Sequence, residues 1–226
     1  MQTKSKRPSA DEEYGSEIVR LSRTGTPVPL SKHGRRVTIR TLEPSDYDHW
    51  IEIRQRCRNW LLVWEPRPAG ATFPPEDRHS FASRCALRDR ERQMGSGFGF
   101  GIFVGEQLVG ELTLSSVIRG PFQNAVIGYW IDQAQAGNGY VPEAVATALA
   151  FAFDDLGLHR IEIAIIPRNE RSRRVVEKLN IRLEGVAEKF LQINGVWEDH
   201  ARFAITAEEW RERRDEFLDR WILPEL

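Results

Sequence analysis

The sequence predicts a mixed α/β domain in which helices cover the faces of one twisted sheet. Three observations carry this prediction. Segments of alternating apolar residues indicate strands, a glycine turn at 136–141 joins one strand to an apolar helix, and Asn194-Gly195 joins two alternating segments as a hairpin. A strand–helix–strand crossover beside antiparallel hairpins requires a sheet of mixed direction. The fold class is therefore α/β (α+β).

Composition excludes several classes of protein. The chain has 226 residues, of which 41% are hydrophobic and 29% charged, and its formal net charge is -1. That profile fits a folded core and does not suggest a dedicated nucleic-acid binder. Its two cysteines, Cys57 and Cys85, have no metal-ligand spacing. The longest apolar run, 144–153, is too short to span a bilayer, and the first residues lack the apolar core of a signal peptide. We expect a soluble, cytoplasmic protein without a metal.

The chain begins with a polar arm and an alternating strand. Residues 1–34 are rich in polar and charged side chains, and we interpret them as an arm that is either draped over the domain or disordered. The domain is expected to cover 35–226. It opens with a strand over 35–40, which alternates as a half-buried strand does.

The next segments are interpreted as two helices around a loop. The first helix begins at Pro44 and runs to Cys57, and the aromatic, proline-rich stretch 58–75 is expected to be an ordered loop. A charged helix follows over 75–94. Its expected apolar contacts are Phe81, Cys85 and Leu87.

The second half alternates between strands and helices. Proline in a first turn, Asn169 as an N-cap and Asn180 as a left-handed cap bound two of its helices. The expected strands are 97–104, 107–117, 124–132 and 159–166, then the hairpin about Asn194-Gly195; the expected helices are 139–157, 169–179 and a charged C-terminal one around 208–218.

The turn Ala136-Gly137-Asn138-Gly139-Tyr140-Val141 is the first candidate for a ligand site. Glycines let a backbone approach a ligand, and the N–H groups of a helix N-terminus attract anions. A tight strand-to-helix turn would explain the same residues. The turn lacks the Lys-Ser/Thr of a P-loop and the third glycine of the dinucleotide fingerprint.

The segment 168–178 is the second candidate. It carries five basic and two acidic residues, a local charge of +3. Arginine grips phosphate well, although a capped and solvated helix would show the same pattern. Because the two segments follow successive strands, we expect them at the same end of the sheet, where turn, helix dipole and arginines converge on one polyphosphate.

The stretches GYWIDQAQAGNGYVPEAV and LGLHRIEIAIIPRNERSRRVVEKLNIRLEGVAEKF, with RNWLLVWEP and GELTLSS, resemble the GNAT acyltransferases. Within them the chain is similar to the ribosomal-protein-alanine N-acetyltransferase branch, over Val37 to Thr206. The resemblance implies a mainly antiparallel, twisted sheet that is splayed at the coenzyme site and flanked by helices. It also implies acetyl-CoA as co-substrate and no metal.

The resemblance assigns coenzyme-binding positions. Gly139 matches the pyrophosphate loop of the family, whereas Ala136 replaces its first Gln or Arg and Val141 its last small residue. The preceding strand end is expected to pair with the pantetheine arm. The implied coenzyme-binding residues are Trp130, Ile131, Gly137, Asn138, Gly139, Tyr140, Val141, Asn169 and Arg174.

The same resemblance implies some of the catalytic residues, and the sequence offers further candidates for the base and for the acceptor pocket. Ser172 matches a serine proposed to protonate the departing thiolate, and Asn169 matches an asparagine that contacts the coenzyme. Glu111, on an expected strand beside the split, is our candidate base, with an ordinary strand residue as the alternative. Trp64 and Glu65 are expected to line the acceptor pocket, unless the tryptophan belongs to the core.

The expected activity is direct acetyl transfer to a primary amine. A terminal α-amine has a pKa of roughly 7.7–8.0, against about 10.4 for lysine, so a weak base suffices for an N-terminus. We expect a protein N-terminus beginning with Ala or Ser, of the ribosomal-protein type. The alternatives are a small amine (amino acid, polyamine or antibiotic) or a CoA-binding regulatory module without turnover. No nucleic acid or membrane partner is expected, and a homodimer is left open.

Overall fold

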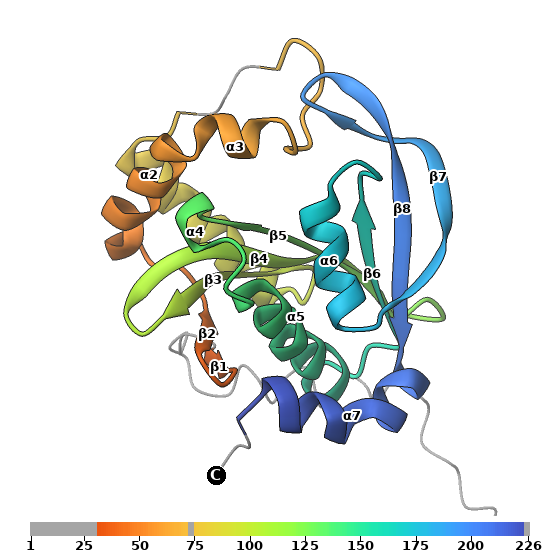
Figure 1. Cartoon of the computed structure of the whole chain (residues 1–226). Coiled ribbons are helices and arrows are strands. Elements are labelled where there is room, and N and C mark those ends of the chain that lie inside the picture. Colours follow the sequence, from red (N-terminus) through yellow and green to blue (C-terminus); the bar gives the residue numbers. More distant parts are fainter. Residues whose placement is uncertain (1–30, 72–74, 224–226) are drawn as a thin grey trace, which may run out of the picture.

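The computed structural model describes residues 31–71 and 75–223. Eight strands form one sheet in the order β1-β2-β3-β4-β5-β6-β8-β7, and helices cover both of its faces (Figure 1). The strands are β1 Ser31–His33, β2 Val37–Arg40, β3 Phe98–Val104, β4 Gln107–Ile118, β5 Asn124–Ile131, β6 Arg160–Ile165, β7 Arg182–Ile193 and β8 Val196–Thr206. The predicted α/β class is confirmed.

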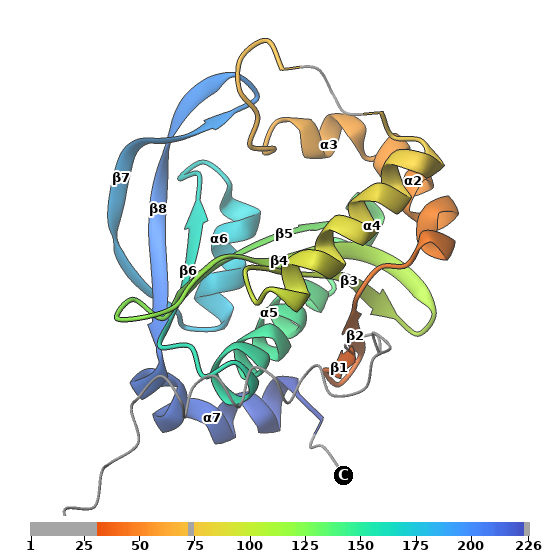
Figure 2. The ribbon, with the colours of Figure 1, turned by 180° about the vertical axis from the view of Figure 1, so that it is seen from behind.

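The helices divide into two layers. The helix α5 crosses one face with α6 and α7, whereas α4 lies over the other, as the view from behind shows (Figure 2). The helices are α2 Tyr47–Arg56, α3 Arg58–Leu62, α4 Arg78–Gln93, α5 Tyr140–Ala150, α6 Glu170–Lys178 and α7 Ala207–Trp221, with short turns η1 Pro44–Asp46, η2 Gln133–Gln135 and η3 Phe151–Asp155. None of the helices in these described ranges has the length and apolarity that crossing a membrane requires.

The sheet opens between β5 and β6. All recorded strand pairs are antiparallel except this one, which is parallel and joins 124–126 to 160–162. Beyond these residues β5 continues to pair with β4, and β6 continues to pair with β8. The two halves of the sheet therefore separate toward the end of β5, which confirms the predicted splay.

A large core lies on the α5 side and a smaller one on the α4 side. Every residue from Val141 to Leu149 is buried, because α5 is packed between the sheet and α7. The smaller core contains Trp50 and Phe81, with Trp130 packed against it. The sheet thus holds the start of α5 on one face and the aromatic residues of α2 and α4 on the other.

Two predicted turns are confirmed in detail. Asn194 and Gly195 both have positive φ, at 44° and 86°, which is the geometry of a tight hairpin turn. Asn180 has φ 49° after α6, where a left-handed cap was expected.

Three predictions were wrong in their boundaries or contacts. The expected loop 58–75 contains α3, since Leu61 is buried in the smaller core and gives that turn a packed side. Leu87 is half exposed instead of facing inward. The expected arm contributes β1, which pairs with β2, while residues 1–30 lie outside the described residues.

Candidate active site

Among the described residues, the glycine turn between β5 and α5 leaves a run of backbone N–H groups without a recorded protein acceptor. Gly137 has φ 89° and Gly139, the N-cap of α5, has φ 83°, conformations that favour glycine. Within the part of the chain that the structure describes, no protein acceptor is recorded for the N–H groups from Gly137 to Val141. Side chains leave the turn open, because a Cβ on Gly137 would meet nothing within 4 Å. This is the donor set that a pyrophosphate requires, so the turn fits the coenzyme.

The start of α6 lies across the splay from β5. Asn169 Oδ1 accepts a hydrogen bond from the N–H of Ser172 at 3.2 Å and so caps the helix as predicted. The Tyr129 hydroxyl donates to the carbonyl of Ser172 at 3.2 Å. Burial raises the pKa of Tyr129, so this hydroxyl stays neutral and remains a donor. Tyr129 thereby fixes α6 against the strand that ends in the glycine turn.

The strand end predicted to bind pantetheine faces this opening. The N–H of Asp132 donates to Val109 of β4 at 2.7 Å. Because N–H directions alternate along a regular strand, we expect the N–H of Ile131 to point away from β4. The side chain of Trp130 instead packs on the α4 side, where the guanidinium of Arg54 lies 5.7 Å from its ring centroid.

The arginines of 168–178 do not all turn toward one phosphate. Arg168 stacks on Trp64 at 4.8 Å and pairs with Glu198, and Arg171 stacks on Trp60 at 4.3 Å. Arg174 remains exposed on α6 and lies 3.6 Å from Glu170. The expected convergence of the whole basic segment is therefore wrong, because Trp60 of α3 and Trp64 just after it attract two of its guanidinium groups.

Glu111 lies on the α4 side of the sheet, opposite Trp130 on the neighbouring strand. Its carboxylate is almost buried and accepts from Trp50 Nε1 at 2.6 Å and from both terminal nitrogens of Arg84, at 2.9 and 3.1 Å. Both oxygens are therefore engaged. The prediction that Glu111 is the base stays a prediction.

Trp64 and Glu65 lie where the chain leaves α3 and reaches the β7–β8 hairpin (Figure 1). Trp64 is half-buried, and Glu65 pairs with Arg54. Backbone bonds join this segment to the hairpin tip: Arg67 N to Gln192 O at 2.8 Å, Asn194 N to Glu65 O at 3.1 Å and Gly195 N to Arg67 O at 2.9 Å. The segment thus runs beside the hairpin like a short added strand.

Two positions near the turn were missed from the sequence. Asp132 is buried and accepts from Arg56, from the Cys57 thiol and from Ala134 N, so it anchors the turn to the end of α2. Burial alone would raise its pKa, but these donors hold the pKa of Asp132 below its ordinary value. An acid directly after an apolar strand was the available signal.

Arg36, at the start of β2, is the second missed position. It contacts the turn and Glu143 of α5, which lies 107 residues further along the chain. No local sequence pattern predicts a contact between residues so far apart in the chain.

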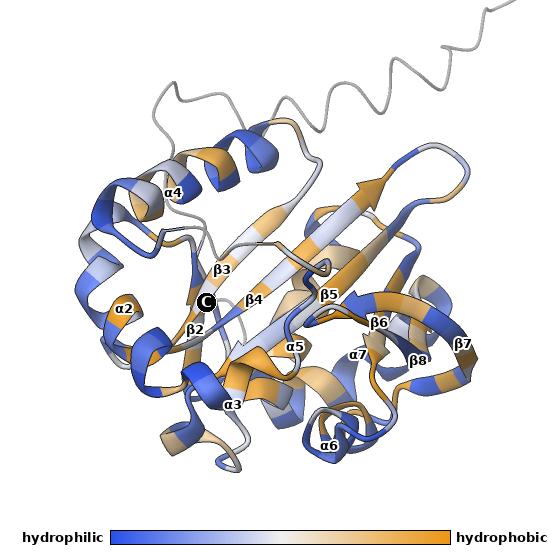
Figure 3. Ribbon diagram, turned by 90° about the horizontal axis from the view of Figure 1, so that it is seen from above, coloured by the Kyte–Doolittle hydropathy of each residue, from blue (hydrophilic) through white to orange (hydrophobic). Residues whose placement is uncertain are grey.

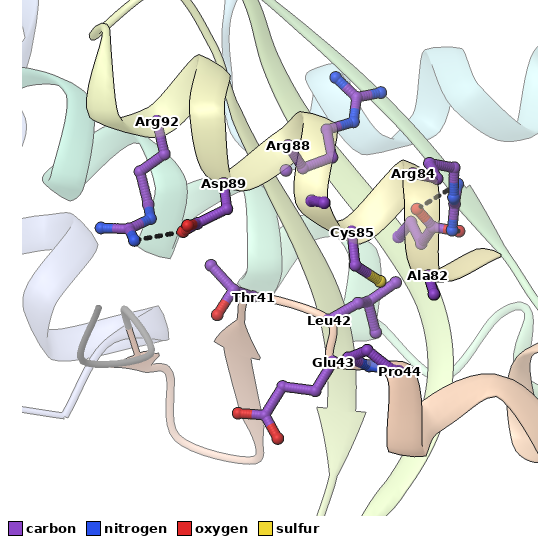
Figure 4. Close-up of a pocket in the computed structure, with 13 residues that line it drawn as sticks. Thr41, Leu42, Glu43, Pro44, Ala82, Arg84, Cys85, Arg88, Asp89 and Arg92 are labelled. Atoms are coloured by element: carbon purple, nitrogen blue, oxygen red, sulfur yellow. Dashed lines mark hydrogen bonds and ion pairs between the residues drawn. The ribbon is translucent and has the colours of Figure 1, made fainter. Parts of the chain in front are cut away.

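A separate cavity of about 290 Å³ lies between α4 and the sheet (Figure 4). Leu42 and Cys85 point into it, while its charged rim is paired internally as Arg84–Glu111 and Arg92–Asp89. Burial raises the pKa of the Cys85 thiol to about 11, which disfavours the reactive thiolate. Apart from Glu111, the cavity shares none of the predicted site residues.

A search for metal-binding groups in residues 31–71 and 75–223 finds no cluster of three or more His, Cys, Asp or Glu side chains. The groups recorded around the splay are the backbone donors of the glycine turn, the Tyr129 hydroxyl and the arginines of α6. The helix α6 that carries several of them is largely hydrophilic (Figure 3).

Comparison with known proteins agrees with this geometry. A family model described as an acetyltransferase (GNAT) domain matches residues 36–182. The probable N-acetyltransferase YjcK of Bacillus subtilis (strain 168) is 35% identical over 174 residues, which cover 76% of this chain and 94% of that protein. The [ribosomal protein uS5]-alanine N-acetyltransferase of Escherichia coli (strain K12) is 29% identical over 178 residues, covering 77% and 90%.

A solved structure gives the same result in three dimensions. RimJ of Mycobacterium smegmatis, in complex with CoA-disulfide, superimposes with a TM-score of 0.77 at 31% identity, covering 84% of this chain and 92% of that one. The chain belongs to the GNAT acetyltransferase family and is an acetyl-CoA-dependent N-acetyltransferase.

Proposed function

We propose that the enzyme acetylates the α-amine of a protein N-terminus, of the kind carried by ribosomal proteins that begin with Ala or Ser. The observation that carries the proposal is the connection of 65–67 to the hairpin tip at 192–195, beside the splay. We infer that this connection limits the path by which an acceptor reaches the site past α3. A narrow chain end fits such a path better than a folded surface does. A relative named for uS5-alanine acetylation supports the same choice.

The proposed chemistry uses the groups around the splay. Acetyl-CoA supplies the activated acetyl group. We assign the N–H groups of 137–141 to the phosphates and the Ile131 N–H to the acetyl carbonyl oxygen, where negative charge develops. As the amide bond forms and the C–S bond breaks, the Ser172 hydroxyl donates a proton to the departing sulfur, and the proton that the attacking nitrogen loses passes through solvent to restore the hydroxyl. Since an α-amine has a pKa of roughly 7.7–8.0, about a tenth to a sixth of it is neutral at pH 7, against less than about 0.1% of a lysine side chain, so strong base catalysis is unnecessary.

The test is an acceptor screen with acetyl-CoA in which free thiol is measured. The panel contains Ala- and Ser-initiated peptides, the same peptides with a blocked N-terminus, lysine peptides, a polyamine and an aminoglycoside. We expect turnover with the free N-termini and none with their blocked counterparts, and tandem mass spectrometry should place the acetyl group on residue one.

Other results would assign a different acceptor. Turnover confined to the polyamine or the aminoglycoside would replace the proposal with a small-amine acetyltransferase. Acetylation of the blocked peptides on lysine would show that the connection does not select chain ends. Coenzyme binding without thiol release across the panel would favour a regulatory module.

A further inference from the structure

Arg36 fastens the start of β2 to the first turn of α5. Its backbone N–H and that of Val37 both donate to Glu143 Oε1, the latter at 2.9 Å, and its Nε donates to Glu143 Oε2 at 2.9 Å. Glu143 is only 1% exposed. The guanidinium also reaches forward, where Nη1 donates to the carbonyl of Asn138 at 3.0 Å and the group lies 5.2 Å from the Tyr140 ring centroid.

This guanidinium is adjacent to the donors of the glycine turn. Its Nη2 lies 3.2 Å from the position that a Cβ on Gly139 would occupy, and half of the side chain is exposed. Because Nη1 binds the Asn138 carbonyl, the peptide groups of the turn are held in one orientation. The positive charge reinforces the partial positive charge of the α5 N-terminus, which favours an anion there.

The turn itself lacks a basic side chain at its first position. Ala136 offers no donor, and Arg168 and Arg171 are directed to tryptophans of the α3 segment. Arg174 remains exposed on α6, whereas the guanidinium of Arg36 is hydrogen-bonded to the turn itself.

We propose that Arg36 is the positioning residue of the coenzyme pyrophosphate site, holding the 138–140 turn and supplying the charge that Ala136 lacks. The proposal is independent of which amine is acetylated. It rests on the assignment of the glycine turn to the coenzyme phosphates, and the Gly139→Glu variant tests that assignment separately.

One substitution removes the guanidinium of Arg36 and still leaves the buried Glu143 with hydrogen-bond donors. In Arg36→Gln, Glu143 keeps the backbone N–H groups of residues 36 and 37, so its carboxylate remains hydrogen-bonded. Arg35→Gln is the matched control, because it makes the same charge change one residue earlier, at a side chain that donates to the Asp219 carbonyl of α7.

The experiment measures CoA affinity by calorimetry at several salt concentrations for wild type, Arg36→Gln and Arg35→Gln. We expect Arg36→Gln to bind CoA about tenfold more weakly, as loss of a charge-assisted contact predicts, and with a shallower dependence on salt. Arg35→Gln should match wild type in both. Dephospho-CoA, which keeps the pyrophosphate but lacks the 3′-phosphate, should show the same tenfold loss with Arg36→Gln.

Specific outcomes would overturn the proposal. One is equal CoA affinity in the two variants. Another is weaker binding by Arg36→Gln with an unchanged salt dependence, which would mean that Arg36 only supports the fold. If Arg36→Gln does not fold, Arg36→Lys decides: lysine keeps the charge but cannot bind Glu143 and the Asn138 carbonyl together, so it should bind CoA more weakly with the salt dependence of wild type, and a shallower salt dependence would exclude the charge as the cause.

Discussion

Asn169 and Ser172 show how one turn of helix can serve both structure and chemistry. The capping bond uses the Asn169 Oδ1 atom, so its amide nitrogen is left to contact a ligand. The Ser172 backbone is held twice, through its N–H by Asn169 and through its carbonyl by Tyr129. Its hydroxyl has no recorded partner within the described ranges, so a fixed backbone carries a group that is free to donate.

Ser172→Ala should lower kcat by about 10²-fold or more, the usual contribution of a positioned general acid, with little change in CoA affinity. The backbone bonds to Asn169 and Tyr129 do not involve the hydroxyl, so the fold should persist. Thiol release and calorimetry measure the two quantities. The exposed Ser83→Ala of α4 is the control, and unchanged turnover in Ser172→Ala would remove this residue from the mechanism.

The Glu111→Gln variant distinguishes a structural role of this buried carboxylate from a role as the catalytic base. Since three hydrogen bonds hold it to Trp50 and Arg84, we expect the variant to lose about 1–3 kcal/mol of unfolding free energy, with the pH profile of kcat/KM retained. Denaturant titration and a pH–rate series measure these effects. A variant of wild-type stability that lacks one limb of the pH profile would instead identify Glu111 as the base.

At the scale of elements, the site depends on the joint between β5 and α5. Asp132 ties the turn to the end of α2, Arg36 ties it to the start of β2, and the glycines at 137 and 139 have positive φ. Two elements distant in sequence thus hold the glycine turn in place, and the proposed coenzyme site is preorganised.

Gly139→Glu should abolish coenzyme binding, because it puts a carboxylate against phosphate and a side chain at φ 83°. Thermal denaturation with and without acetyl-CoA measures this, since a ligand raises the midpoint of a protein that binds it. Gly157→Glu is the control: its φ of 61° imposes similar strain in open space beyond the far end of α5. Protection of the Gly139 variant by acetyl-CoA would mean that the phosphate site lies elsewhere.

At the scale of the whole molecule, an ion-pair network joins β6 and the edge strand β7 to α7. Arg160 of β6 and Arg182 of β7 both bind Glu184, and Arg182 continues to Glu209 of α7. Hydrogen bonding to Arg160 and Arg182 lowers the pKa of Glu184 from 4.5 to about 2. The same arginine, Arg182, lowers the pKa of Glu209.

These lowered pKa values set the direction of acid sensitivity. A carboxylate with a depressed folded-state pKa stabilises the protein above its unfolded pKa and loses that contribution as the pH falls toward the folded value. The unfolding free energy should therefore decline between pH 4.5 and about 2. Denaturant titrations across this range measure the slope, which Glu184→Gln should make shallower; an equal slope in wild type and variant would contradict the assignment.

Much of the secondary structure of this protein could be predicted from its sequence, because it depends on local chemistry. Alternation and turn residues located most strands, the Asn194-Gly195 hairpin and the Asn169 cap, because each depends on neighbours within a few residues. The motif residues also identified the family and the glycine turn. The helix α3 was not predicted from the sequence. Only one side of this helix is packed, and residues remote in the sequence contribute the contacts that bury it.

Tertiary structure alone decided how the side chains of the site are used. The tryptophans of the α3 segment attract Arg168 and Arg171, Arg84 and Trp50 engage Glu111, and Arg36 joins Glu143 across 107 positions. Each outcome depends on which partners the fold brings within a few ångströms, and hydrogen bonds and ion pairs act at that range. A sequence lists the charges, whereas the packing of β2, α3 and α4 determines which of them meet.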